Sequence, residues 1–195
     1  MGALAKRALD LALGGPVFLV CLPVIGVAAL LIYVETGRPI FFRQERVGYT
    51  GNLITILKLR TMYRDIPSPE AIGQVDVAHA LVTPVGRWLR RFKVDELSQL
   101  TSVLVGSMSL VGPRPTLPSQ VVGYTSAERE RLAVPPGLTG WAQVNGNTKL
   151  SWPDRIALDR WYVRHRSFWL DIWILGLTLA VVVRGERANR GSLER

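Results

Sequence analysis

The chain has 195 residues, a formal net charge of +9, a pI near 10.4 and a hydrophobic share of 48%. This length suits one domain with its own core, while a single cysteine and two histidines exclude a disulfide framework and a histidine-based metal site. Because the mean hydropathy is also positive, at +0.20, we expect an anionic partner: nucleic acid, an acidic membrane surface or a phosphorylated substrate.

An apolar segment follows Lys6 and Arg7 and covers residues 11–34. A helix of ~24 residues is about 36 Å long, which is enough to cross a bilayer and too long for the core of a signal peptide. Pro23 would kink such a helix, and basic residues at both ends favour the cytoplasmic side for both. From its composition alone, the segment favours a re-entrant helix broken near Pro23 and a spanning helix to the same degree.

Residues 39–46 and 52–60 read as two strands joined by a turn at residues 48–51. In the second strand, a period of two places Lys58 and Arg60 on one face, where both can point at a phosphate. A solvated basic edge that discourages strand aggregation explains the same pattern equally well.

The proline- and glycine-containing residues 63–80 read as a loop. Thr83 and Pro84 then predict a helix start, with a short helix over residues 85–92 that carries Arg87, Arg90 and Arg91. This basic run ends at Lys93, directly before two acids.

The two acids are Asp95 and Glu96, and the apolar positions 97, 100, 103 and 104 behind them follow one face of a helix. One reading is ordinary helix-start chemistry, because acids there complement the helix dipole. The other is a reactive pair: neighbouring cations lower carboxylate pKa values, and ionised oxygens suit Mg²⁺, which usually takes one or two carboxylates plus substrate phosphates.

Arg114 lies between Pro113 and Pro115, whose rings fix φ on both sides of it. Such a turn can hold a guanidinium in one orientation for phosphate or carboxylate recognition, although a plain rigid turn is the alternative.

The remaining segments predict short helices around one loop. Residues 125–128 form a capping box, and residues 135–147 form a glycine- and amide-rich loop that includes Trp141 and Gln143. A helix begins at Pro153. Residues 168–183 are apolar but contain Asp171, and their tryptophans and flanking arginines favour an in-plane interfacial helix, followed by a basic tail that frays.

Four stretches, in this order and spacing, resemble the monotopic phosphoglycosyl transferases of bacterial glycoconjugate assembly, the bacterial sugar transferase family. They are KLRTM at 58–62, DELSQL at 95–100, SMSLVGPRP at 107–115 and PGLTGWAQVNG at 136–146. The resemblance covers nearly the whole chain.

The resemblance implies a mainly helical α+β, membrane-associated monotopic fold with an N-terminal re-entrant helix, a β-hairpin and interfacial amphipathic helices. Residues 1–36 would form the re-entrant helix, 37–166 the cytoplasmic catalytic region and 167–195 the interfacial helix and tail. The family kinks its membrane helix at a serine–proline pair, whereas here Leu22 precedes Pro23. Without the further membrane helices of larger relatives, the chain is expected to be a minimal catalytic unit.

The resemblance also implies a reaction: transfer of a sugar-1-phosphate from a nucleotide sugar, usually a UDP-sugar, to polyprenol phosphate. The family uses the aspartate as a nucleophile, so Asp95 would form a phosphosugar-aspartyl intermediate and hold Mg²⁺, with Glu96 supporting metal or proton handling. The expected substrate-binding residues are Lys58, Arg60, Arg90, Pro113, Arg114 and Gln143.

The expected setting is the cytoplasmic face of the inner membrane, with the nucleotide-sugar donor, the polyprenol phosphate acceptor and membrane lipid as partners. We expect no nucleic acid, and a homodimer is compatible with the apolar surface. The rival readings are a membrane-anchored binding protein for anionic lipid or nucleic acid, and a metal-dependent hydrolase of nucleotide sugars or lipid diphosphates.

Overall fold

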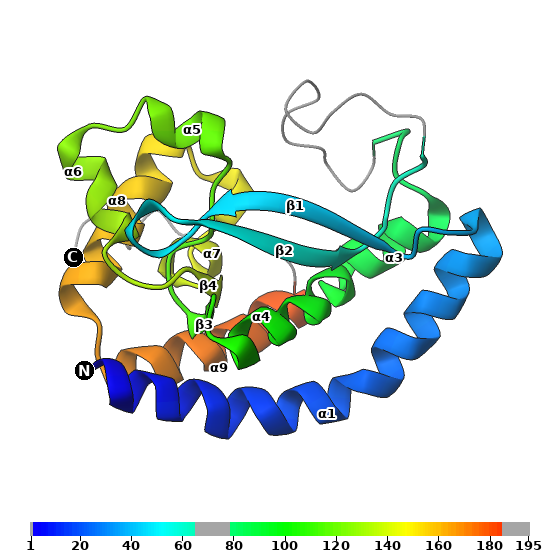
Figure 1. Ribbon diagram of the computed structural model, residues 1–195, viewed down its shortest axis with the longest axis horizontal. Helices are drawn as coiled ribbons and strands as arrows, with labels where there is room; N and C mark the ends of the chain where they lie inside the picture. Colours follow the sequence, from blue (N-terminus) through cyan, green and yellow to red (C-terminus); the bar gives the residue numbers. More distant parts are fainter. Residues whose placement is uncertain (1, 65–78, 185–195) are drawn as a thin grey trace.

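The computed structural model describes residues 2–64 and 79–184 of the chain. Its longest element is α1 (Ala3–Thr36), which runs along one side of the molecule and curves toward its C-terminal end (Figure 1). Within the described residues, α1 is the one helix that is long and apolar enough to cross a membrane. Both Pro16 and Pro23 lie inside it. The break expected near Pro23 is not found, because the helix continues through this residue. A proline removes one hydrogen bond, which bends a helix whose other turns remain intact.

The predicted hairpin is confirmed. Strands β1 (Phe41–Val47) and β2 (Leu53–Leu59) pair antiparallel, with a 3₁₀ turn, η1 (Tyr49–Gly51), between them. The register pairs Phe41 with Leu59 and Val47 with Leu53. Arg60 therefore lies just past the end of β2, where the strand's alternation no longer fixes its direction.

The helix starts read from the sequence are also confirmed. Thr83 caps α3 (Pro84–Arg91), because its Oγ1 accepts a hydrogen bond from the Gly86 amide at 2.9 Å. Thr125 and Glu128 form the capping box of α6 (Ser126–Arg129). The helix predicted from Pro153 is α8 (Trp152–His165), capped by Ser151.

The other helices are short, apart from α9 (Phe168–Arg184). They are the 3₁₀ helices η2 (Val94–Gln99), η3 (Glu130–Leu132) and η4 (Asn147–Lys149), and the α-helices α4 (Leu100–Val105), α5 (Pro118–Val122) and α7 (Trp141–Val144). The loop expected over residues 63–80 and the tail after Arg184 fall mostly outside the described residues.

A small parallel pair, β3 (Ser109–Val111) and β4 (Gly137–Thr139), was not predicted from the sequence. Three residues are too few to show a strand period. The two strands approach so closely that a Cβ on Gly137 would lie 2.1 Å from the Gly112 amide nitrogen and 2.6 Å from its carbonyl oxygen. Glycine at position 137 therefore allows two of the four stretches, residues 107–115 and 136–146, to lie side by side.

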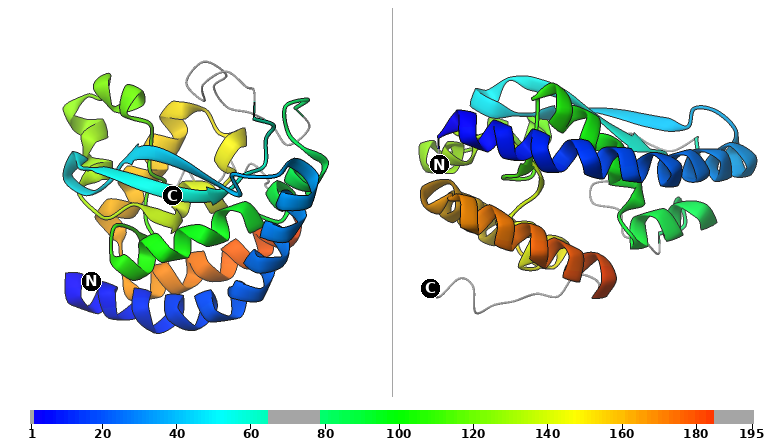
Figure 2. Two further views of the ribbon diagram at one scale, coloured as in Figure 1. Left: turned by 45° about the vertical axis from the view of Figure 1, so that its right-hand side comes forward. Right: turned by 90° about the horizontal axis from the view of Figure 1, so that it is seen from below.

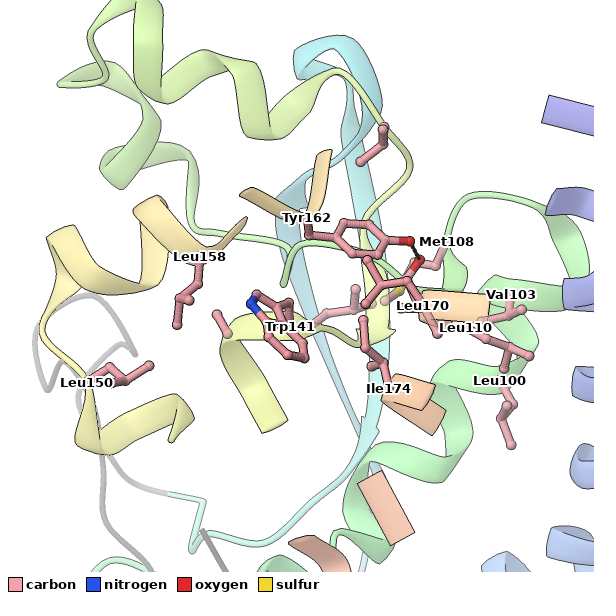
Figure 3. Packing of buried hydrophobic residues seen from close by; sticks show 14 residues of the cluster. Leu100, Val103, Met108, Leu110, Trp141, Leu150, Leu158, Tyr162, Leu170 and Ile174 are labelled. Carbon is pink, nitrogen blue, oxygen red and sulfur yellow. Dashed lines mark hydrogen bonds between the residues drawn. The ribbon is translucent and has the colours of Figure 1, made fainter. Parts of the chain in front are cut away.

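The elements form two layers around a shared core. Figure 1 shows α1, α4 and α9 along one side, with the hairpin, α5, α6 and α8 above them. Figure 3 shows the main cluster between the layers, where Trp141 and Tyr162 meet Leu158, Leu170 and Ile174. A second cluster joins α1, β2, α3 and η2 through the buried residues Ile25, Ala28, Ile32, Leu59, Leu89 and Val94.

Polar contacts fix the N-terminal turns of α1 against the rest of the chain. Lys6 Nζ donates to Asp171 Oδ2 of α9 at 2.7 Å, and the Arg7 guanidinium donates to the last carbonyls of α4. Asp10 accepts from the Leu110 amide at 3.0 Å. The apolar helix is thus held to both α9 and β3 at its basic end.

We predict that Gly137→Ala lowers the free energy of unfolding by at least about 3 kcal/mol, because the added Cβ meets backbone atoms that cannot rotate away. The melting temperature should fall by several degrees, measured by thermal unfolding of the protein in detergent. Gly123→Ala is the matched control, since a Cβ there has nothing within 4 Å. Equal melting temperatures for the two variants would contradict the close approach of β3 and β4.

Candidate active site

The acid pair begins η2, which packs against β2. Lys93 precedes it in the left-handed region, with φ of +57°. The two acids therefore lie in a 3₁₀ helix and not, as expected, at the start of an α-helix. The α-helix that follows, α4, begins at Leu100. Ser98 Oγ donates to the Leu57 carbonyl at 2.8 Å and ties η2 to the strand.

Glu96 is clamped by two cations from different elements. Lys58 Nζ of β2 donates to Oε1 at 2.7 Å, and the Arg114 guanidinium donates to Oε1 at 2.5 Å and to Oε2 at 3.3 Å. Burial alone would raise the pKa of Glu96, but the charges of Arg114 and Lys58 outweigh burial and hold that pKa well below its usual range. Glu96 is therefore an anion whose two oxygens are both engaged.

Asp95 is buried, with 7% of its surface exposed, and its Oδ1 accepts no hydrogen bond from any residue in the described part of the chain. Burial, and then the neighbouring charge of Glu96, raise the pKa of Asp95 to about 6, while Lys58 and Arg90 oppose the rise. The expectation that nearby cations lower both carboxylate pKa values is correct for Glu96 and wrong for Asp95. The cations are engaged by Glu96, and burial dominates at Asp95.

Arg90 and Lys58 both lie beside the pair, as predicted, while Arg60 is directed elsewhere. Arg90 Nε donates to Thr61 Oγ1 at 2.8 Å, and its charge lies close enough to affect Asp95 and Glu96. Burial lowers the pKa of Lys58, and the charge of Glu96 opposes that shift. Arg60 Nη2 instead donates to the carbonyls of Thr36 and Gly37, at the end of α1. Lys58 and Arg60 thus do not point together.

Pro113 and Gln143 belong to the neighbouring β3–β4 region. The Pro113 carbonyl accepts from the Gly137 amide at 2.9 Å, which places the turn that carries Arg114. Gln143 Nε2 donates to the Leu138 carbonyl at 2.9 Å. Across residues 2–64 and 79–184, no hydrogen bond joins Gln143 to Asp95 or Glu96.

Two contacts that shape the site could not be predicted from the sequence. Thr61, which orients Arg90, and Ser98, which ties η2 to β2, carry no signal of these roles in their spacing. Both contacts join segments that are far apart in the chain, so no local pattern reports them.

The donor set fits a hard cation only in part. In the described ranges, no three His, Cys, Asp or Glu side chains gather in a way that could hold a metal ion. Both Glu96 oxygens bind cationic side chains, so Asp95 is the carboxylate that the pair offers, and its buried Oδ1 accepts no hydrogen bond in the described residues. One carboxylate suits Mg²⁺ that takes its other ligands from substrate phosphates and water.

Comparison with known proteins agrees with this arrangement. The sequence model of the family described as bacterial sugar transferase matches residues 1–185. The chain is 40% identical, over 97% of its own length and 94% of the relative's, to a protein of Bacillus subtilis (strain 168) named uncharacterized sugar transferase EpsL.

Two further relatives carry names that state a reaction. The chain is 38% identical to a UDP-glucose:undecaprenyl-phosphate glucose-1-phosphate transferase of Caulobacter vibrioides, over 95% of the chain and 72% of that protein. It is 37% identical to a protein of the same name in Escherichia coli (strain K12), over 90% of the chain but 39% of that longer protein. The match over residues 1–185 confirms the resemblance read from the four stretches, and the chain belongs to the bacterial sugar transferase family.

Proposed function

We propose that the chain transfers a sugar-1-phosphate from a nucleotide sugar, with UDP as the nucleotide, to a membrane polyprenol phosphate. The relatives named for this reaction support it, since they are similar to the chain over nearly all of its length. The observation that carries the proposal is the different bonding of the two acids. Glu96 is fully engaged by cations, whereas Asp95 keeps an unpartnered oxygen beside it.

In the proposed mechanism, a carboxylate oxygen of Asp95 attacks the β-phosphorus of the nucleotide sugar. The new Asp95 O–P bond forms as the bond from the β-phosphorus to the bridging oxygen breaks, and the nucleoside monophosphate leaves with that oxygen. A phosphate oxygen of the polyprenol phosphate then attacks the same phosphorus and releases the Asp95 carboxylate. Covalent catalysis of this kind divides one difficult displacement into two easier ones.

The neighbouring residues would prepare Asp95 for this attack. Burial and the charge of Glu96 destabilise the ionised Asp95, which makes it more reactive than a solvated carboxylate. The charge of Arg90 balances part of that charge. Mg²⁺ bound at Asp95 together with the donor would neutralise the diphosphate during transfer.

The distribution of exposed apolar side chains supports a seat in the cytoplasmic leaflet of the inner membrane. Seen from below in Figure 2, α1 and α9 lie on the near side of the molecule. Both expose large apolar residues, among them Leu19, Val20, Val27, Leu30 and Val34 of α1 and Trp169, Trp173, Leu179 and Val183 of α9. In this seat the curve of the unbroken α1 would bring both of its ends to one face and α9 would lie in the interface, so the acid pair would face lipid-bound acceptor and cytoplasmic donor together.

Asp95→Asn tests the chemistry. We expect release of nucleoside monophosphate from a panel of UDP-sugars to require Mg²⁺ and polyprenol phosphate in the wild type, and to fall at least a thousandfold in the variant, because an amide cannot form the acyl phosphate. Asp154→Asn, at a carboxylate that accepts a hydrogen bond from Ser151, is the matched control and should retain activity. Release without a lipid acceptor would indicate the hydrolase, and near-wild-type turnover of Asp95→Asn would exclude Asp95 as nucleophile.

The same substitution should not destabilise the protein at high pH. Because the folded-state pKa of Asp95 is raised to about 6 from an ordinary 3.8, ionised Asp95 opposes folding above pH 6, and this penalty disappears as the pH falls toward 4. Asp95→Asn removes a penalty of about 3 kcal/mol at pH 8. Its melting temperature should exceed that of the wild type at pH 8 and approach it at pH 4. A lower melting temperature at pH 8 would contradict the raised pKa.

The raised pKa also predicts the pH profile of transfer. The rate should fall about tenfold for each pH unit below 6, because protonated Asp95 cannot attack phosphorus. The measurement is the initial rate of nucleoside monophosphate release between pH 5 and 8 with Mg²⁺ and donor well below saturation, because this rate reports the pKa of the free, metal-free enzyme. A rate that stays constant down to pH 5 would show that Asp95 titrates at its ordinary value.

A further inference from the structure

The turn that presents Arg114 is held at every carbonyl from Pro113 to Thr116. The Pro113 carbonyl accepts from the Gly137 amide at 2.9 Å, and the Thr116 carbonyl accepts from the Val47 amide at 2.8 Å. The Pro115 carbonyl accepts from Arg46 Nη1 at 3.4 Å. The Arg114 carbonyl itself accepts from Arg131 Nη2 at 3.0 Å. Three segments, β1, η3 and β4, thus fix four consecutive peptide groups.

Arg131 is a buried residue of η3 with unusually many restraints. It is 3% exposed, its Nη2 also donates to Asp159 of α8, and its Nη1 donates to the Tyr124 hydroxyl at 2.5 Å. The guanidinium lies over the rings of Tyr124 and Trp152, at 5.8 and 5.5 Å from their centroids. Asp159 is 2% exposed. A buried ion pair of this kind gives little net stability, because removing both charges from water costs about as much as their attraction returns.

The bond to the Arg114 carbonyl has a specific geometric consequence. The rings of Pro113 and Pro115 fix φ on both sides of Arg114, and a residue before proline is restricted to extended backbone. The rotations that the rings do not lock are ψ of Pro113, φ of Arg114 and, within the extended region, ψ of Arg114, and each of them moves the Arg114 carbonyl group. Arg131 holds the Arg114 carbonyl in place. The side chain of Arg114 donates to both oxygens of Glu96.

We infer that Arg131, held in turn by Asp159, is a positioning residue for Arg114, and through Arg114 it keeps Glu96 clamped beside Asp95. The inference rests on the proposed function for its effect on transfer, but the placement of Arg114 can be measured without turnover. Arg131 and Asp159 contact neither reacting group. Their role is to set the backbone from which Arg114 reaches the site.

The central variant replaces the pair with apolar residues of similar size, Arg131→Met with Asp159→Leu. Such replacements of buried ion pairs often preserve or raise stability. We expect the variant to fold with a melting temperature at or above that of the wild type, while kcat/KM for the nucleotide sugar falls at least tenfold. A residue with a purely structural role would instead change the melting temperature and activity together.

The matched control lies one residue away on the same two elements. Glu130 of η3 accepts from Arg160 Nε of α8 at 3.0 Å, and both side chains are 29% exposed. Glu130→Leu with Arg160→Met removes the ion pairs that Glu130 makes with Arg160 and Arg164 of α8, but no contact to the Arg114 carbonyl. Its kcat/KM should remain within twofold of the wild type.

A double-mutant cycle with Arg114→Ala separates positioning from general damage. If Arg131 acts through Arg114, replacing the Arg131–Asp159 pair should lower kcat/KM by no more than twofold in the Arg114→Ala background. An additive loss of tenfold or more there would overturn the inference. If the apolar pair fails to fold, Asp159→Asn, which keeps an acceptor oxygen for Arg131, takes its place in the same cycle with the same criterion.

The readout that does not depend on turnover is the Nε–Hε resonance of Arg114 in ¹⁵N-arginine-labelled protein, assigned by its loss in Arg114→Lys. In the wild type and the Glu130–Arg160 control it should be narrow and distinct, and in the pair-replaced variant it should move to the position of solvent-exposed arginines. An unchanged resonance would overturn the inference. If the wild type transfers nothing, the proposed function fails, and this resonance still decides whether Arg131 positions Arg114.

Discussion

The ion cluster at Glu96 is the interaction on which the site depends. Lys58 comes from the hairpin, Glu96 from η2 and Arg114 from the turn after β3, so one carboxylate joins three parts of the chain. With Glu96 neutralised by two cations, Asp95 lies next to it with an unpartnered oxygen and a raised pKa. The surroundings of the two adjacent carboxylates thus move their pKa values apart, and the proposed mechanism gives Glu96 a structural task and Asp95 the reactive one.

The fold places this cluster where the apolar helix α1 meets β2, α3 and η2. Ile25, Ala28 and Ile32 of α1 pack in the same buried cluster as Leu59, Leu89 and Val94, which belong to the elements that carry the site. At its other end, α1 is tied by Lys6 to Asp171 and by Arg7 to the end of α4. A helix suited to lipid is therefore a structural neighbour of Asp95, as the proposed reaction between a lipid phosphate and a water-soluble donor would require.

The sequence predicts those parts of the structure that have local signals. The hairpin follows from two β-rich runs around a turn, α3 and α6 from caps at Thr83 and Thr125, and α8 from Pro153. The acid pair, Lys58, Arg90 and Arg114 meet as expected. Missed are the β3–β4 pair, the direction of Arg60, the raised pKa of Asp95 and the role of Arg131, each of which depends on burial or on contacts between distant residues.

The central claim is that Asp95 is the covalent nucleophile, and intact-protein mass spectrometry tests it most directly. The wild-type protein would be mixed with Mg²⁺ and a preferred UDP-sugar, without polyprenol phosphate, and quenched in acid. The account predicts a mass increase of one sugar phosphate, located on Asp95 by peptide mapping, lost when polyprenol phosphate is added and absent in Asp95→Asn. An adduct on another residue, or transfer that proceeds at full rate with no adduct at any time point, would contradict it.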